Sequence, residues 1–125
     1  MRIEQHFQPS CSEFTIILKM DDTYSRKNEK LIMAIIEYVN HGAIGNENKD
    51  NIKFLKSEVK KLGFEWQDFI DCIPTQGGGE DIGAHSDTLF DKPVVVFSGY
   101  IGDQGDFLVR LFNAANIPNE WRDIL

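Results

Sequence analysis

Apolar and polar residues alternate near the start of the chain, which is the period-two pattern of a strand. Every second residue from Phe14 to Met20 is apolar, so these side chains would share one face of a strand over 14–20. Ile17 would lie on the opposite face, which indicates that this side is only half covered. A weaker alternation precedes the strand, so we predict a hairpin over 1–20.

The clearest strand is an unbroken apolar run, Val94–Phe97. A strand that is apolar on both faces is typical of the centre of a sheet, where both sides are covered. Pro93 can occupy the first position of a strand, where its missing N–H is tolerated. We therefore expect 93–98 to be the central strand, beside the strand over 14–20.

Apolar residues at steps of three and four, the spacing of one helix face, predict helices over about 25–40, 50–62 and 106–116. Gly63 would end the second of these helices. A shorter amphipathic segment predicts one more helix over 64–73.

Two segments lack such periodicity. Residues 75–92 contain four glycines and few apolar side chains, so we predict a long surface loop, within which Thr88–Phe90 could form a short strand. Near the end of the chain, Asn116 and Pro118 stand where an N-cap and a first-turn residue would, which predicts a last short helix with Trp121 turned inward.

This order of elements predicts a single domain over 1–125 with an α+β or α/β fold. It would hold a small three- to four-stranded sheet, with the helices predicted above packed against it. A chain of 125 residues can bury a sufficient core without disulfides or metal. Cys11 and Cys72 form no CxxC pattern, so we expect two free thiols in a reducing compartment.

No segment approaches the roughly 18–20 consecutive apolar residues of a membrane span. The first ten residues also lack the apolar stretch of a secretory signal. We therefore expect a cytoplasmic protein without membrane association.

Charge is distributed unevenly between the two halves of the chain. Residues 1–61 contain ten Lys/Arg and nine Asp/Glu, a net charge of +1, whereas residues 62–125 contain three Lys/Arg and eleven Asp/Glu, a net charge of −8. The two values sum to the overall −7. The acidic half would repel phosphate backbones and attract basic partners, so we expect no direct nucleic-acid binding. A lysine-rich stripe over 49–61 is then a solvated helix face.

Carboxylates and one imidazole gather in the glycine-rich segment before the central strand. Such side chains can bind a divalent cation, and glycines would let the loop wrap around it. Their spacing matches neither an EF-hand nor a zinc motif, so a polar surface loop is favoured and no metal or other cofactor is expected. The candidate metal ligands are Glu80, Asp81, His85 and Asp87.

Signatures of catalysis are missing. The glycine-containing segment 98–106 follows a strand and opens a helix, a place where phosphate can bind, but Asp103 and Asp106 would repel an anion. An Asp-capped turn is therefore favoured. The three histidines lie in unrelated segments, and no GxSxG or HExxH motif occurs.

Aromatic residues are interleaved with the carboxylates of the second half, a combination that proteins use to bind basic proteins. The aromatics are Trp66, Phe69, Phe90, Tyr100, Phe107 and Trp121. Each one taken singly is expected in the core. The candidate partner-binding residues are Glu80, Asp81, Asp87, Asp91, Tyr100, Asp103 and Asp106.

The sequence favours a small acidic protein that neutralises a basic macromolecular partner by occluding its surface. In size, acidity and lack of catalytic motifs it is similar to bacterial toxin-immunity proteins and phage-encoded inhibitors of host defence, an analogy of class without a family motif. Two alternatives remain open. One is a small metal-dependent hydrolase or transferase that uses the 80–87 segment, and the other is a structural subunit of a homo-oligomer.

Overall fold

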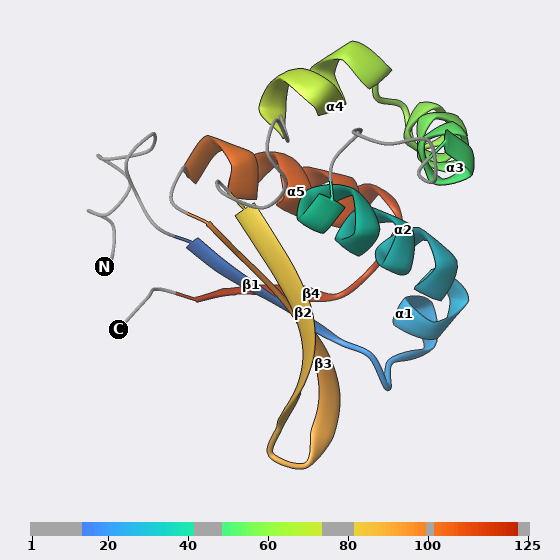
Figure 1. Ribbon diagram of the computed structural model, residues 1–125. Coiled ribbons are helices and arrows are strands. Elements are labelled where there is room, and N and C mark those ends of the chain that lie inside the picture. The colour runs from blue at the N-terminus through green and yellow to red at the C-terminus, as the bar shows by residue number, and fades with distance from the viewer. Residues whose placement is uncertain (1–13, 42–48, 74–81, 100–101, 123–125) are drawn as a thin grey trace.

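The computed structural model describes residues 14–41, 49–73, 82–99 and 102–122, and the structural statements below refer to these residues. The described residues form five helices and four strands, with four helices in succession between β1 and β2 (Figure 1). Their bounds are β1 (Phe14–Lys19), α1 (Thr23–Lys27), α2 (Glu29–His41), α3 (Lys49–Lys61), α4 (Trp66–Cys72), β2 (Ile82–Leu89), β3 (Lys92–Gly99), α5 (Gly102–Ala114) and β4 (Asn119–Arg122).

The four strands form one antiparallel sheet in the order β2-β3-β1-β4. β3 is an interior strand and pairs with β1, which confirms both the α+β fold and the central position predicted for 93–98. The register places Ile16 opposite Phe97 and Leu18 opposite Val95, so these apolar side chains share one face. The rest of the predicted hairpin, over 1–13, lies outside the described residues.

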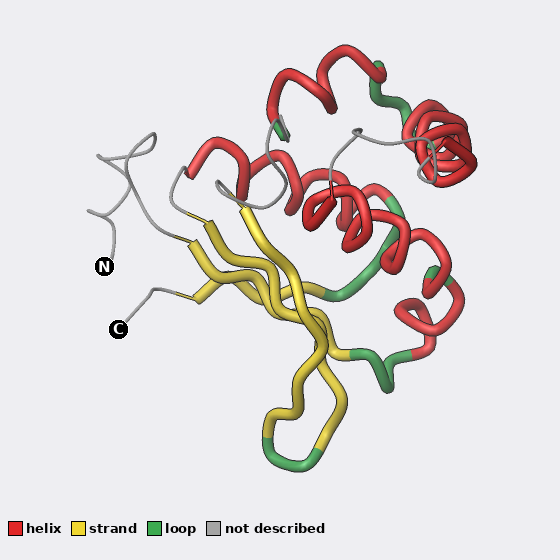
Figure 2. Tube along the Cα trace, in the orientation of Figure 1, coloured by secondary structure: helices red, strands yellow, loops and turns green. Residues whose placement is uncertain are grey.

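All the described helices lie on one side of the sheet (Figure 2). On the opposite side, Ile17 and Val94 are buried but do not join the main core cluster, and Val96 is only half-buried. The unbroken apolar run therefore predicted the position of β3 correctly. We expected both faces of β3 to be covered alike. The helices lie over the face that carries Val95 and Phe97, and no described helix lies over the face that carries Val94 and Val96.

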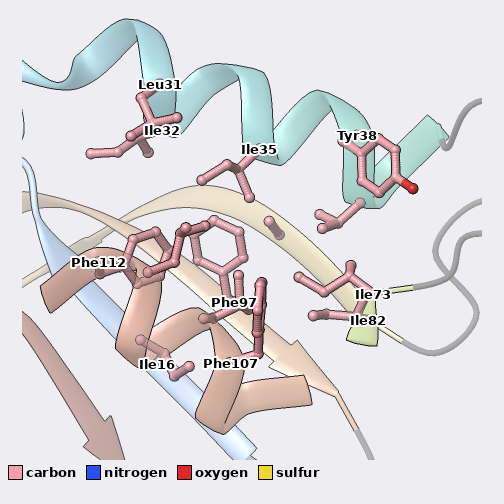
Figure 3. Packing of buried hydrophobic residues seen from close by; sticks show 14 of the residues in the cluster. Ile16, Leu31, Ile32, Ile35, Tyr38, Ile73, Ile82, Phe97, Phe107 and Phe112 are labelled. Atoms are coloured by element: carbon pink, nitrogen blue, oxygen red, sulfur yellow. The ribbon is translucent and has the colours of Figure 1, made fainter. Parts of the chain in front are cut away.

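The core lies between the sheet and the helices (Figure 3). α2 packs on β2, while α5 packs on the other three strands. α4 adds Phe69, whose ring lies 5.2 Å from that of Tyr38 in α2 and 5.9 Å from that of Phe107 in α5. The fully buried phenylalanines are Phe14, Phe69, Phe97, Phe107 and Phe112, so most of the phenylalanine content serves the core.

The helix predicted over 25–40 is divided in two at Asn28. Asp22 caps the first part by accepting a hydrogen bond from the backbone N–H of Tyr24, at 2.8 Å. The Asn28 side-chain amide donates to the carbonyl oxygens of Tyr24 and Ala115, at 2.8 and 3.3 Å. Asn28 therefore ends α1 and ties it to the end of α5.

The helices predicted over 50–62 and 64–73 are confirmed as α3 and α4. Gly63 ends α3 as expected. Its φ of 95° is accessible to glycine at little cost, and it lets the N–H of Phe64 reach the carbonyl of Val59 at 3.1 Å. The five lysines of α3 are exposed, which agrees with a solvated face.

One prediction about the second half is wrong, and the bounds of another are corrected. Residues 82–89 form strand β2 rather than a surface loop, because each of them pairs with a residue of β3. The helix expected over 106–116 begins earlier, at Gly102, so Asp103 lies in its first turn and not in a preceding loop.

The last predicted helix is also wrong, because residues 119–122 form strand β4 beside β1. Asn116 does not start a helix but ends α5. With a φ of 62° it lets the N–H of Ile117 reach the carbonyl of Phe112 at 2.9 Å, the C-terminal motif in which Asn can replace Gly. The chain then turns back, and Trp121 pairs with Ile16 across the sheet.

Candidate partner-binding surface

The structure separates the predicted partner-binding residues into two places. Asp87 and Asp91 lie on the β2–β3 hairpin, whereas Asp103 and Asp106 lie in the first turns of α5. β3 runs between these two places, and its eight residues span about 25 Å. Glu80, Asp81 and Tyr100 lie outside the described residues.

β2 and β3 are joined by the shortest common type of hairpin turn. Leu89 pairs with Lys92, so Phe90 and Asp91 alone form the loop. Their φ values are 53° and 65°, as a type I′ turn requires at both central positions. The twist of this turn matches that of the strands, but its usual residues are Asn and Gly, and a bulky aromatic in the left-handed region is strained.

Phe90 is the most exposed large hydrophobic side chain in the described part of the molecule, with 84% of its surface accessible. Figure 1 shows the hairpin extending beyond the helices, with this turn at its far end. Thr88 and Lys92 near the turn are also exposed and Leu89 is half-buried, whereas Ile82 and Ala84 at the start of β2 are buried. The expectation that each aromatic lies in the core therefore holds for Phe69 and Phe107 but is wrong for Phe90, and it is also wrong for Trp121, which is 37% exposed.

The hairpin is held from two sides, at its base and near its turn. On one side, the side-chain amide of Asn40 donates to the carbonyl of Ala84 at 2.9 Å and accepts from its N–H at 3.1 Å. On the other, the N–H of Met20 donates to the carbonyl of Pro93 at 3.0 Å. An ion pair between Lys92 and Asp21, with 3.8 Å between Nζ and Oδ2, lies close to the turn. These contacts fix the direction in which the turn projects.

The second acidic region, on α4 and α5, surrounds Cys72. Burial is the largest cause of a raised pKa at this thiol, the guanidinium of Arg110 lowers the pKa, and nearby carboxylates raise it again. Those carboxylates are Asp68, Asp71 and Asp103. A half-buried thiol kept in its neutral form is a poor nucleophile, which supports the expectation of an inert cysteine. Cys11 lies outside the described residues.

Most of the described carboxylates of the acidic half face solvent without a Lys or Arg partner among the described residues. Of the eight described between residues 62 and 125, only Glu120 has a Lys or Arg partner among the described residues, and it is also the only one that is half-buried rather than exposed. The seven exposed ones are Glu65, Asp68, Asp71, Asp87, Asp91, Asp103 and Asp106. Their charges therefore produce a negative potential over α4, the start of α5 and the hairpin.

Two of the four candidate metal ligands are described, and they lie together on the solvent side of β2. His85 Nε2 is 3.6 Å from Asp87 Oδ2, and both side chains are 60% exposed. Within the described ranges, no three His, Cys, Asp or Glu side chains are grouped closely enough to hold a metal ion. Glu80 and Asp81 lie outside these ranges, so the four-residue metal site stays a prediction.

Sequence reasoning did not select Phe90 as a partner-binding residue. The sequence signal was the dipeptide Phe90-Asp91 between two short segments, since two residues are the length of the shortest common hairpin loop. Phe-Asp is an uncommon pair for such a turn. The polar sequence of 85–88 concealed the strand that creates this turn.

No helix in the described part of the chain is long and apolar enough to cross a membrane. Comparison with protein-family models, with curated proteins and with solved structures gives no match to this chain.

Proposed function

We propose that this chain is a small acidic binding protein that neutralises a basic protein partner in the cytoplasm. One observation carries the proposal: seven of the eight described carboxylates of residues 62–125 are exposed, and none of these seven has a Lys or Arg partner among the described residues. Exposed, uncompensated charges of one sign steer an oppositely charged partner and accelerate its association.

The mechanism would be steric occlusion. Carboxylates of the acidic half pair with Lys and Arg side chains that the partner otherwise uses to hold nucleic acid, and the bound chain then covers that surface. A toxin restrained by an immunity protein and a host defence protein restrained by a phage protein are partners of this kind. Free nucleic acid would be repelled by the same carboxylates.

The test begins with affinity purification of the tagged chain from a lysate of its source organism, followed by mass spectrometry. A protein with a basic surface that co-purifies is then produced in pure form. Surface plasmon resonance across a salt series measures the rate at which this partner associates with the acidic chain. An assay of the partner's own activity then measures inhibition by the chain. We expect one-to-one binding, inhibition, and an association rate that falls as salt screens the field.

The matched controls are charge reversals on different surfaces. Asp87→Lys with Asp91→Lys, or Asp103→Lys with Asp106→Lys, should slow association, whereas Lys53→Glu with Lys56→Glu on α3 should leave it nearly unchanged. Three outcomes contradict the proposal. They are an association rate indifferent to salt, an equal loss from the α3 reversal, and the failure of any basic protein to co-purify.

A further inference from the structure

We propose that the β2–β3 turn is the anchor of the interface and that Phe90 inserts into an apolar pocket of the partner whose rim carries Lys or Arg. The inference rests on the proposed function, since it names the residue through which the acidic protein would hold its basic partner. It goes further because charge alone steers association, whereas a buried aromatic side chain determines how long a complex lasts.

Phe90 contributes nothing to folding that explains its presence. With 84% of its surface exposed, it gains almost no stabilisation from burial. Its φ of 53° lies in the left-handed region, where a side chain with a Cβ is disfavoured and Asn or Gly is preferred. An exposed aromatic in a strained turn therefore destabilises the free protein, and such residues are concentrated at binding sites.

The setting of Phe90 indicates the chemistry of its pocket. Asp91 is adjacent in the turn, and Asp87 lies nearby on β2, both exposed. Lys92 is the one Lys or Arg of the β2–β3 hairpin, residues 82–99, and it already lies 3.8 Å from Asp21. An apolar ring between uncompensated carboxylates is complementary to an apolar pocket with a cationic rim, since the rim pairs with the carboxylates while the pocket desolvates the ring.

The tip of the hairpin is also placed to enter a recess. Asn40 holds β2 at Ala84, and β3 stays paired with β1 as far as Val94, so residues 88–93 project beyond β1 with Phe90 in the turn at their end. Ser86, Asp87 and Thr88 are exposed, so little of the protein surrounds this part of the hairpin. A two-residue turn ordered before binding loses little conformational entropy when it enters a pocket.

The test uses the partner identified by co-purification, in pure form, and three variants of this chain. Phe90→Asn replaces the ring with a residue that suits the turn. We expect its affinity for the partner to fall about 10- to 100-fold, mostly through faster dissociation, while its melting temperature rises by about 2–5 °C. Phe90→Tyr keeps the ring and should stay within about threefold of the wild-type affinity.

Met33→Gln is the matched control, because Met33 is also an exposed apolar side chain, 46% accessible, but on α2. It should leave affinity unchanged. Wild-type affinity of Phe90→Asn together with salt-dependent association would overturn the anchor and leave the proposed function intact. Salt-independent association, or no basic partner at all, would overturn both. Self-association of the wild type that Phe90→Asn abolishes would assign the ring to a second copy of this chain and also refute the inference.

Discussion

The side chain of Asn40 occupies the place of a neighbouring strand at Ala84. Its amide group donates to the Ala84 carbonyl at 2.9 Å and accepts from the Ala84 N–H at 3.1 Å, as a peptide group of an adjacent strand would do. A backbone N–H makes one strong hydrogen bond, and that of Ala84 is made to Asn40. This N–H therefore points away from β3, toward the outer edge of the edge strand β2. Asn40 thus covers the edge of β2 where the hairpin begins.

We predict that Asn40→Ala destabilises the protein by about 1–3 kcal/mol, since it leaves two nearly buried backbone groups of Ala84 without partners. Urea unfolding would measure the loss, and size-exclusion chromatography should show increased self-association through the uncovered edge. Asn51→Ala is a close control, because the Asn51 amide donates to a single carbonyl, that of Ala34, at 3.0 Å. Hydrogen exchange should rise in β2 for the first variant and not for the second; equal exchange in β2 would contradict this role of Asn40.

Gly105 in α5 lies directly against two aromatic rings. A Cβ at this position would lie 2.8 Å from Cγ of Phe14 and 2.8 Å from Cη2 and Cζ3 of Trp121. The partly exposed indole of Trp121 can move, but Phe14 is fully buried in β1 and cannot. Alanine at position 105 would raise the free energy of unfolding by about 1 kcal/mol through its higher helix propensity, whereas the clash would lower it by about 1–3 kcal/mol.

We therefore expect Gly105→Ala to lower the melting temperature by several degrees, as measured by circular dichroism. Gly83→Ala is the control, because a Cβ on Gly83 meets no atom within 4 Å. It should be neutral or slightly stabilising. A Gly105→Ala protein as stable as the wild type would show that the contact with Phe14 relaxes easily.

The raised pKa of Cys72 predicts slow alkylation. In a Cys11→Ser background, the thiol should react with iodoacetamide more slowly than free cysteine does near pH 8, because burial and the surrounding carboxylates keep it protonated. Arg110→Ala should slow the reaction further, since Arg110 lowers this pKa. Faster reaction than free cysteine would indicate an activated thiol instead.

The same raised pKa fixes the sign of a stability effect. The folded state keeps the thiol neutral to higher pH than the unfolded state does. The contribution of this pKa difference to the free energy of unfolding is therefore fully present below the ordinary pKa of 9.0. It is lost as pH rises through the folded-state pKa. Cys72→Ser should therefore flatten the decline of stability above pH 9, as followed by urea unfolding.

Local signals in the sequence were sufficient for part of the fold. α3 and α4 were predicted within about two residues, because apolar spacing is encoded within each helix and Gly63 follows the first of them. β3 was located because Val94–Phe97 is apolar on both faces and rich in β-branched residues, which is typical of an interior strand.

The remaining elements depend on contacts that are distant in sequence. β2 is polar over 85–88 because its end is exposed, and only pairing with β3 makes it a strand. β4 is four residues long and exists through its pairing with β1. The candidate site depends on both effects: the carboxylates could be counted in the sequence, but the turn that exposes Phe90 follows from a strand the sequence did not reveal.

The separation of the two acidic regions leads to a last prediction, about salt. The hairpin and the start of α5 lie about 25 Å apart along β3, whereas the field of an exposed charge reaches only about 10 Å at 0.1 M salt. If the hairpin contacts the partner, Asp103 and Asp106 act on the approaching partner only from a distance. Asp87 and Asp91 instead lie within the contact itself.

Asp103→Lys with Asp106→Lys should therefore slow association at 20 mM salt, and this effect should nearly vanish at 300 mM. Asp87→Lys with Asp91→Lys should slow association at low salt and also accelerate dissociation, and the faster dissociation should persist at 300 mM, because contact pairs are screened less than distant charges. Surface plasmon resonance of both variants at the two salt concentrations separates the regions. If the α5 variant were the one with faster dissociation at high salt, the interface would lie on α4 and α5, and the hairpin would only steer the partner.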